Sequence, residues 1–337
     1  MAEHIVVFWT EAGHGIGMGH LCRSLVIARE CIKLGMTTLF VINDDPFTKA
    51  RLLSQGFLFE LGEMDGAIPH SITTKPHKTI IFDTKKDIEP LIGNLKKLGH
   101  RVVLLDNTSP ARLVADVVIY PVAQFVNDLN WDGFAGRVYG GAKYVPVAEE
   151  YVKIRQQSTC LKHEPPYRVV VSMGGSDPQQ LTYPVVKALL DLPYICQTKV
   201  VIGPAFMPDD RLIKLEQSEH EALKIIRGQN DLSFIMADCH VAITAVGITL
   251  YELAAVGVPA IIIGNYVEDR RDMELYQKLG MNLPIGYHED ITATQIQETV
   301  SCLLQDAVIW QHLREIGWQT IDGWGAQRIA GLLATRD

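Results

Sequence analysis

Short apolar runs alternate with helical segments along most of the chain, and no other feature of the sequence constrains the fold as strongly. Runs such as 5–9, 79–82 and 168–173 are apolar almost throughout, which is typical of strands buried on both faces. This alternation predicts parallel sheets whose faces are covered by helices. Ligands of such sheets bind beyond the carboxyl ends of the strands, so the residues that follow the strands are the first candidates for a site.

The 337 residues exceed one ordinary core and predict two domains. A polar segment, 155–166, ends in a pair of prolines and is the expected linker. We therefore predict an α/β fold of two Rossmann-like domains, 1–155 and 167–320, whose parallel sheets face each other across a cleft. The last segment, 321–337, is expected to form a C-terminal helix that packs back on the first domain.

The same patterns place the individual elements. The expected strands are 5–9, 37–42, 57–61, 79–82, 101–105 and 117–120 in the first domain, and 168–173, 198–202, 222–226, 241–244 and 260–263 in the second. In the second domain, Asp177 and Pro178 suit the N-cap and the first position of a helix that reaches Leu190.

The composition argues against several classes of protein. The net charge is −8 and no compensating basic block occurs, which argues against general nucleic-acid binding. The six cysteines are scattered without a Cys-x-x-Cys pair, as expected of reduced thiols in a cytoplasmic protein. The first residues lack a basic segment and no apolar run has membrane-spanning length, so we expect a cytoplasmic protein without a membrane span.

A glycine-rich stretch follows the first strand, and Gly17 and Gly19 in it lead into a helical segment. The first N–H groups of a helix are unpaired and its dipole favours negative charge, so the stretch predicts an anion site. His20 and Arg23 are three residues apart and share one helix face at that site. An imidazole there suits acid–base chemistry beside an anionic leaving group, although a histidine at a helix start can instead be a cap or a surface residue.

Two more turns with glycine join a strand to a helix in the second domain. One is made of Gly174, Gly175, Ser176 and Asp177, and the other of Gly247, Ile248 and Thr249. Amide groups from both turns would bind one diphosphate. Glu252, one helical turn further on, is placed to accept hydrogen bonds from ribose hydroxyls. The alternatives are plain turn geometry for the glycines and a solvated carboxylate for Glu252.

Neither a metal nor another cofactor is predicted. The eleven histidines form no His-x-His or His-Glu-x-x-His group, and no Asp-x-Asp occurs. Cys22 stands where the dinucleotide fingerprint has its third glycine, which disfavours a nicotinamide cofactor. Amides and helix dipoles would then stabilise the leaving group. The charged segment 268–272, which includes Asp269, is either solvated or reaches the cleft.

Three motifs, taken together, resemble a known family. They are Gly17-Met18-Gly19-His20-Leu21-Cys22-Arg23-Ser24, Ser172-Met173-Gly174-Gly175-Ser176-Asp177-Pro178, and Gly247 to Glu252 followed by Leu253 to Pro259. They occur in the family's order, and weaker matches extend the resemblance over nearly the whole chain. The chain resembles the GT-B-fold nucleotide-sugar enzymes, and most of all the UDP-sugar hydrolase of pseudaminic acid biosynthesis and the related spore-coat polysaccharide biosynthesis proteins.

The resemblance implies residues as well as chemistry. His20 would be the base, Asp83 and Asp106 further catalytic residues, and Arg23 and Asp269 possible sugar contacts. The two turns of the second domain, with Glu252, would hold UDP, and Gly17 and Gly19 would contact the same diphosphate.

The implied reaction is metal-independent cleavage of a UDP-sugar at its anomeric carbon, with inversion and release of UDP. It would belong to surface polysaccharide or nonulosonic-acid-type sugar biosynthesis. Two alternatives stay open: an inverting glycosyltransferase that uses the same site, and a non-catalytic nucleotide-sugar-binding homologue. The expected partner is the UDP-sugar itself, and the chain is expected to be a monomer or a homodimer.

Overall fold

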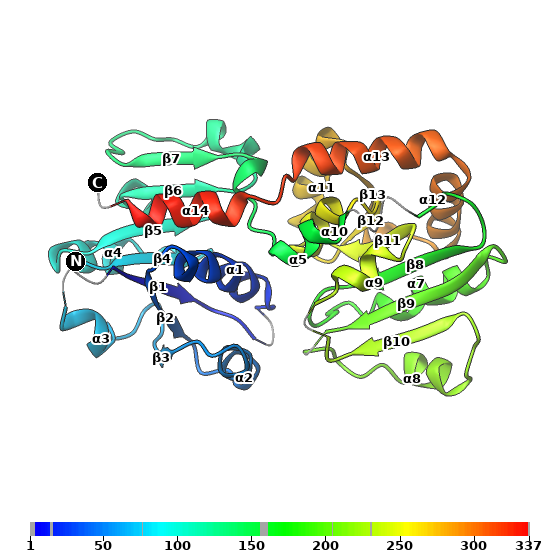
Figure 1. The fold of residues 1–337 in the computed structure, drawn as a ribbon, viewed down its shortest axis with the longest axis horizontal. Helices are drawn as coiled ribbons and strands as arrows, with labels where there is room; N and C mark the ends of the chain where they lie inside the picture. Colours follow the sequence, from blue (N-terminus) through cyan, green and yellow to red (C-terminus); the bar gives the residue numbers. More distant parts are fainter. Residues whose placement is uncertain are drawn as a thin grey trace. The chain divides into compact units, whose positions relative to one another are not determined.

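The chain forms two compact units, shown in Figure 1. The computed structural model describes residues 4–13, 16–75, 77–155, 161–203, 205–229 and 231–335, with the backbone alone for residues 123–125. The first unit consists of Met1–Val147 and Trp324–Asp337, and the second unit of Ala148–Gly323. Among the described residues, no helix is both long enough and apolar enough to cross a membrane.

Seven parallel strands form the sheet of the first unit, in the spatial order β3-β2-β1-β4-β5-β6-β7. The strands are β1 (Ile5–Thr10), β2 (Thr37–Ile42), β3 (Phe59–Leu61), β4 (Thr79–Asp83), β5 (Arg101–Leu105), β6 (Val117–Tyr120) and β7 (Arg137–Gly140). The strand order reverses between β1 and β4, where Thr10 lies opposite Asp83. Such a reversal, or switch point, opens a crevice for ligands beyond the carboxyl ends of the strands.

Helices cover both faces of this sheet. They are α1 (Gly19–Lys33), α2 (Pro46–Ser54), α3 (His70–Thr73), α4 (Glu89–Lys97) and α14 (Gly325–Ala334). One core contains Phe8 of β1 together with residues of α1 and α14, and the other contains Trp9 of β1 with residues of α3 and α4. Successive strand residues therefore enter opposite cores, which is why the strands are apolar throughout.

The C-terminal helix α14 belongs to the first unit, where it packs beside α1 (Figure 1). A side chain at Gly325 would collide with the backbone of Val145, so the helix start requires glycine. At the other end, Nη1 of Arg101 donates to the carbonyl oxygens of Leu332 at 2.9 Å and Thr335 at 2.7 Å. A cation at these carbonyls also complements the helix dipole.

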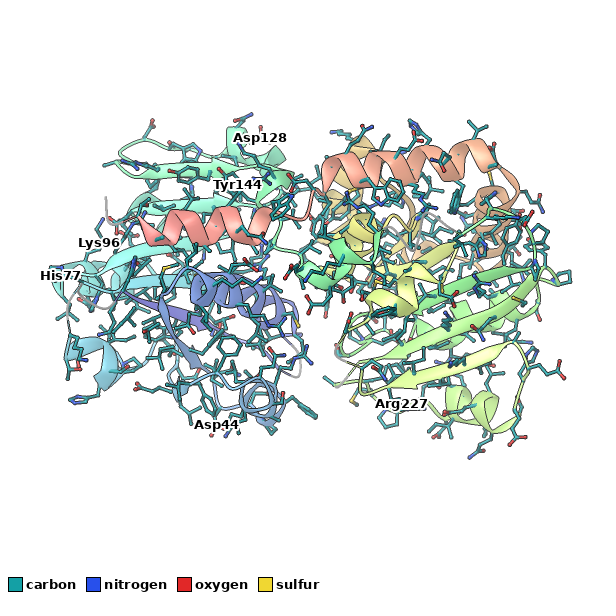
Figure 2. The ribbon with its side chains drawn as sticks, viewed as in Figure 1. Asp44, His77, Lys96, Asp128, Tyr144 and Arg227 are labelled. Carbon is teal, nitrogen blue, oxygen red and sulfur yellow. The ribbon has the colours of Figure 1, made fainter. Side chains whose placement is uncertain are left out.

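Six parallel strands form the sheet of the second unit, in the order β10-β9-β8-β11-β12-β13. The strands are β8 (Tyr167–Ser172), β9 (Ile195–Ile202), β10 (Leu223–Arg227), β11 (Val241–Ala245), β12 (Ala260–Gly264) and β13 (Asn282–Tyr287). The order reverses between β8 and β11, where Ser172 lies opposite Thr244. The edge strand β10 ends in Arg227, labelled in Figure 2, which forms an ion pair of 2.6 Å with Glu216.

The helices of the second unit are α5 (Glu149–Lys153), α7 (Thr182–Leu190), α8 (Asp210–Gln217), α9 (Ser233–Ala237), α10 (Thr249–Val256), α11 (Asp269–Leu279), α12 (Ala293–Gln305) and α13 (Ala307–Thr320). One core joins Val169 and Ile243 of the sheet to residues of α7, α12 and α13. The alternate strand residues Val170, Ala242 and Ile262 are also buried, and α10 packs against β11 and β12.

The structure differs from the predicted domain boundary at residue 155 and from the predicted strand list. The first unit ends at Val147, because α5 and the following residues pack on the second unit. Two edge strands, β7 and β13, were not predicted. Pro284 and Gly286 lie within β13, and its pairing with β12 shifts register there; a sheet edge tolerates both residues, so the strand lacks a regular apolar pattern.

Candidate functional site

Four ionisable side chains meet beyond the carboxyl ends of the strands in the first unit. Asp83 is the last residue of β4, Asp106 follows β5, and the first turns of α1 carry His20 and Arg23. The sequence predicted each of these residues for the site, although not their mutual contacts. The strand order explains the meeting, because β1 leads into α1 and lies beside β4, which in turn pairs with β5.

The His20 imidazole contacts the Asp83 carboxylate through Nδ1 and Oδ1. The Asp83 side chain is only 1% exposed, whereas that of His20 is 20% exposed. Because an ionised carboxylate only accepts hydrogen bonds, a neutral imidazole must carry its proton on Nδ1 and donate it to Asp83. The other ring nitrogen, Nε2, is then a proton acceptor, which is the arrangement of a histidine general base.

Arg23 binds the carboxylates of both aspartates. Its Nε donates to Oδ2 of Asp83 at 2.6 Å and its Nη2 donates to Oδ1 at 2.5 Å, while Nη1 donates to Oδ2 of Asp106 at 3.2 Å. Lys85 donates to Oδ2 of Asp106 at 2.7 Å and to its carbonyl oxygen at 2.9 Å. The result is a row of alternating charge that runs from Lys85 through Asp106 and Arg23 to Asp83, with the His20 imidazole in contact with its last member.

The neighbouring charges keep Asp83, Asp106 and Arg23 ionised. Burial alone would raise the pKa of Asp83, but Arg23, and after it His20, holds that pKa well below its usual range. Burial likewise acts to raise the pKa of Asp106, and the charges of Arg23 and Lys85 lower it instead. Burial opposes the charge of Arg23, yet Asp83 and then Asp106 raise its pKa above the ordinary value.

Two polar residues near these strand ends were not among the predicted site residues. Glu11 follows β1 and is buried; its carboxylate accepts from Lys86 at 2.6 Å and from Thr84 at 3.4 Å. Asn107 is fully buried and its amide donates to the carbonyl oxygens of Thr84 and Lys86 at 2.7 and 2.9 Å. Their position directly behind buried strands is the signal that could have identified Glu11 and Asn107.

The glycine loop before α1 is folded on itself. The N–H of Gly17 donates to the carbonyl oxygen of Gly13 at 2.8 Å, and that of Gly13 donates back to Gly17 at 3.1 Å. Gly17 has a φ of 85°, which glycine adopts without strain. The amide predicted to contact a diphosphate at Gly17 is therefore already used within the loop. Gly19 is the first residue of α1, which has no side-chain cap.

The first turn of the second unit, Gly174 to Asp177, follows β8 at the switch point. Gly174 has a φ of 79° and Asp177 a φ of 45°, so the turn bends away from helical geometry. The predicted helix start at Pro178 is wrong, since α7 begins at Thr182. Asp177 nevertheless caps α7, because its buried carboxylate accepts from the N–H groups of Leu181 and Thr182, both at 2.9 Å. Gly175 and Ser176 lie in the same turn.

The second turn follows β11, the strand paired with β8, and leads into α10. Ile248 is the N-cap residue of α10, and its apolar side chain makes no capping hydrogen bond at the helix start at Thr249. A side chain built on Gly247 would meet no atom within 4 Å, which shows open space in front of this turn. Glu252 lies in the first turn of α10 and is half-buried.

Asp269 is the first residue of α11, the helix that follows the loop after β12. Its Oδ2 accepts from the N–H groups of Asn265 and Tyr266, at 2.7 and 2.9 Å, and the residue is buried. The carboxylate therefore fixes its own loop. Asp44, labelled in Figure 2, is an exposed carboxylate that forms an ion pair with Lys49, whereas the adjacent Asp45 is buried and caps α2 through the N–H of Thr48.

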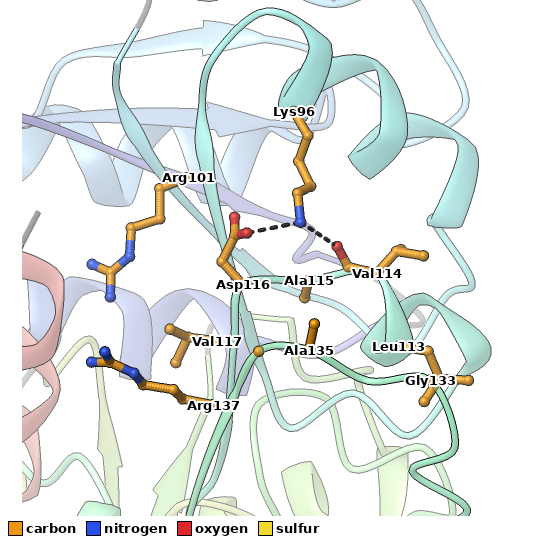
Figure 3. Close-up of a pocket in the computed structure, with 11 residues that line it drawn as sticks. Lys96, Arg101, Leu113, Val114, Ala115, Asp116, Val117, Gly133, Ala135 and Arg137 are labelled. Carbon is orange, nitrogen blue, oxygen red and sulfur yellow. Dashed lines mark hydrogen bonds and ion pairs between the residues drawn. The ribbon is translucent and has the colours of Figure 1, made fainter. Parts of the chain in front are cut away.

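A cavity of about 430 Å³ lies at the opposite edge of the first sheet, at the amino ends of β5, β6 and β7. Figure 3 shows Lys96 in its wall, bound to Asp116 at 2.8 Å and to the carbonyl oxygen of Val114 at 3.1 Å. Arg101 lines the cavity and is the residue that binds the end of α14. The charges of Lys96 and Arg101 thus serve local structure.

Within the described parts of the chain, no three His, Cys, Asp or Glu side chains are grouped to hold a metal.

Two α/β units, each built on a parallel sheet, form the fold of the GT-B glycosyltransferases, and solved structures share it. The glycotransferase of kitacinnamycin matches with a TM-score of 0.69 at 14% identity over 100% of both chains. The Anabaena protein HepE, solved in complex with UDP-glucose, matches with a TM-score of 0.62 at 15% identity over 97% of this chain and 98% of its own. No protein-family model matches the sequence.

Sequence relatives extend over most of the chain. The spore coat polysaccharide biosynthesis protein SpsG of Bacillus subtilis is 24% identical over 98% of this chain and 97% of its own length. The protein MJ1062 of Methanocaldococcus jannaschii is 26% identical over 75% of this chain, and the match spans only 54% of that protein, about half its length.

Proposed function

We propose that the chain is an enzyme that binds a UDP-sugar and breaks the bond between the anomeric carbon and the diphosphate, with His20 as the general base. The observation that carries the proposal is the contact of His20 Nδ1 with the buried Asp83 carboxylate. It leaves Nε2 as the proton acceptor at a switch point, which is where this fold class binds ligands. The similarity to SpsG supports a role in polysaccharide biosynthesis.

The nucleotide is proposed to bind at the switch point of the second unit. The uncapped start of α10 and the turn from Gly174 to Ser176 offer backbone N–H groups to the diphosphate, and the α10 dipole favours its negative charge. Glu252 accepts hydrogen bonds from the ribose in this proposal. The complex of HepE with UDP-glucose, a protein of the same fold, supports UDP as the nucleotide.

The reaction is a displacement at the anomeric carbon. His20 Nε2 takes a proton from the nucleophile, whose oxygen bonds to the anomeric carbon while the electron pair of the broken C–O bond leaves with UDP. The diphosphate then carries the new charge at the helix start, where a preorganised dipole stabilises it. Attack opposite to the leaving group inverts the anomeric centre, and Asp83 stabilises the imidazolium that forms.

Water is the nucleophile that we propose first, because the motifs around His20 resemble those of a UDP-sugar hydrolase. An acceptor hydroxyl is the second candidate, since the glycotransferase of kitacinnamycin has the same fold over the full chain. His20 performs the same proton transfer in both reactions, so the geometry of the first unit suits both nucleophiles.

A panel of UDP-sugars, incubated with purified protein and a chelator but without an acceptor, distinguishes the two candidates. If the enzyme is a hydrolase, we expect UDP to be released together with a free sugar of inverted anomeric configuration. NMR detects both products. Release that begins only when an acceptor fraction is added would replace hydrolysis by transfer. A protein that binds UDP-sugars in calorimetry but releases UDP under neither condition would overturn the catalytic proposal and leave a binding protein.

A further inference from the structure

The Arg23 side chain binds both carboxylates of the candidate site and lies next to the His20 imidazole. We infer that Arg23 is a positioning residue, which clamps Asp83 and Asp106 so that Asp83 accepts the Nδ1 proton of His20, and that Asp106 acts through Arg23. This inference rests on the proposed role of His20 as a base. It reassigns two residues, because the sequence suggested a sugar contact for Arg23 and a catalytic role for Asp106.

The contacts of the guanidinium are the first support. Nε and Nη2 of Arg23 bind the two oxygens of Asp83, and Nη1 binds Asp106. All three nitrogen atoms therefore point at carboxylates of the protein, and the side chain is only 15% exposed. A planar fork that grips both oxygens fixes the rotation of the carboxylate. With Asp83 fixed, one of its oxygens is directed at Nδ1 of His20.

Asp106 is also held in place, by its backbone as well as by its carboxylate. It has a left-handed φ of 57°, and its N–H donates to the carbonyl oxygen of Ile119 at 2.8 Å. Its carboxylate accepts from Arg23 and Lys85. Its side chain therefore serves as the second anchor of the guanidinium, and the loop behind β5 holds it in place.

Arg23 and His20 both bind the Asp83 carboxylate, so removing Arg23 should change the protonation of His20 measurably. Arg23 shares the charge of Asp83 with His20, and its Nη2 lies 3.4 Å from Nδ1. The charged groups described around the imidazole are Arg23 on α1 and Asp83 on β4, with Asp106 and Lys85 beyond them. Removing the guanidinium would leave the full negative charge of Asp83 to a protonated imidazole, and would remove a nearby cation. The protonated form of His20 would then persist to higher pH.

The test uses NMR titration of His20 in the ligand-free protein, with the signal identified by its loss in His20→Gln. Arg23→Met keeps the length of the side chain and removes the charge, whereas Arg23→Lys keeps a charge that cannot bind in a fork. Arg29→Met is the matched control, because Arg29 lies on the same helix and donates to Gln55 at 3.1 Å. Thermal unfolding of each variant reports whether it is folded.

We expect His20 to titrate at higher pH in Arg23→Met, with partial recovery in Arg23→Lys and no change in Arg29→Met. In turnover assays the acid limb of the pH–rate profile should move the same way, while KM changes within about threefold. An unchanged His20 titration with a raised KM would overturn the inference and make Arg23 a sugar contact. A different outcome is also decisive: the His20 titration shifts in Arg23→Met, but His20→Gln does not change turnover. That result would support the positioning role of Arg23 and refute His20 as the general base.

Discussion

The two switch points of the molecule carry different kinds of groups. In the first unit, side chains dominate: His20, Arg23, Asp83 and Asp106 meet in one network of ion pairs. In the second unit the turn from Gly247 leads into a helix start without a side-chain cap. Side chains that titrate suit proton transfer, whereas fixed amides and a helix dipole suit the binding of an anion. The difference suggests that substitutions in the first unit change turnover and those in the second unit change affinity.

The largest expected effect comes from His20→Gln. Removing the proposed base should lower turnover by about 10² to 10⁴, the usual contribution of general-base catalysis, and should leave UDP affinity within a few-fold. Rapid-quench or coupled UDP-release assays, with calorimetry for UDP, measure both quantities. His70→Gln is the control, because His70 is an exposed histidine of the same unit. Turnover that matches the control would remove catalysis from the first switch point.

The converse experiment introduces a negative charge at the start of α10 in the second unit. Ile248→Asp places a carboxylate beside the proposed diphosphate, and should weaken UDP binding by on the order of 1–3 kcal/mol relative to Ile248→Asn, which has the same size. The same charge at a helix N-terminus should stabilise the fold by about 0.3–1 kcal/mol. Calorimetry and chemical unfolding of both variants provide the measurement. Equal UDP affinities would show that the diphosphate does not lie there.

Glu252→Ala sharpens the position of the ribose within the same unit. Loss of the acceptor leaves ribose hydroxyls unpaired, and should weaken UDP by roughly 1–3 kcal/mol while the affinity for inorganic diphosphate stays unchanged. Comparing these two ligands separates the ribose contact from a general loss of the site. Identical losses for both ligands would contradict the ribose assignment and point to damage of the α10 start.

Local sequence patterns predicted most of the fold because buried parallel strands are apolar without interruption. Edge strands escaped prediction because one side of them is open: Pro284 and Gly286 interrupt β13, and β7 is largely exposed. The start of α7 was placed at Pro178, since proline is common at helix starts. The chain instead needs a longer turn there, in which Asp177 caps the helix from a left-handed conformation.

The candidate site was predictable as a set of residues but not as a network. Asp83 and Asp106 each follow an apolar strand, and the glycine string marks His20 and Arg23, so a local pattern identifies each of them. That Arg23 grips both carboxylates depends on the adjacency of β1, β4 and β5, which no local pattern encodes. The predicted sugar contacts, Arg23 and Asp269, both bind groups of the protein itself in the structure.

The smallest expected effect compares the uncapped start of α10 with a capped helix start in the same unit. Elsewhere in the same unit, α12 begins with a capping box in which Thr292 accepts from the N–H of Gln295 at 3.2 Å and the Gln295 side chain accepts from Thr292 at 2.8 Å. Thr292→Ala should cost about 1 kcal/mol of the free energy of unfolding. It should leave UDP affinity unchanged, because α12 follows the edge strand β13 and not the switch point between β8 and β11. Thr299→Ala in the interior of α12 is the control and should be neutral or slightly stabilising, since alanine favours helices. Chemical unfolding gives the stability and calorimetry the affinity. A loss of UDP affinity in Thr292→Ala as large as that in Ile248→Asp would show that nucleotide binding reports the general stability of the unit, and the contrast between the two kinds of helix start would fail.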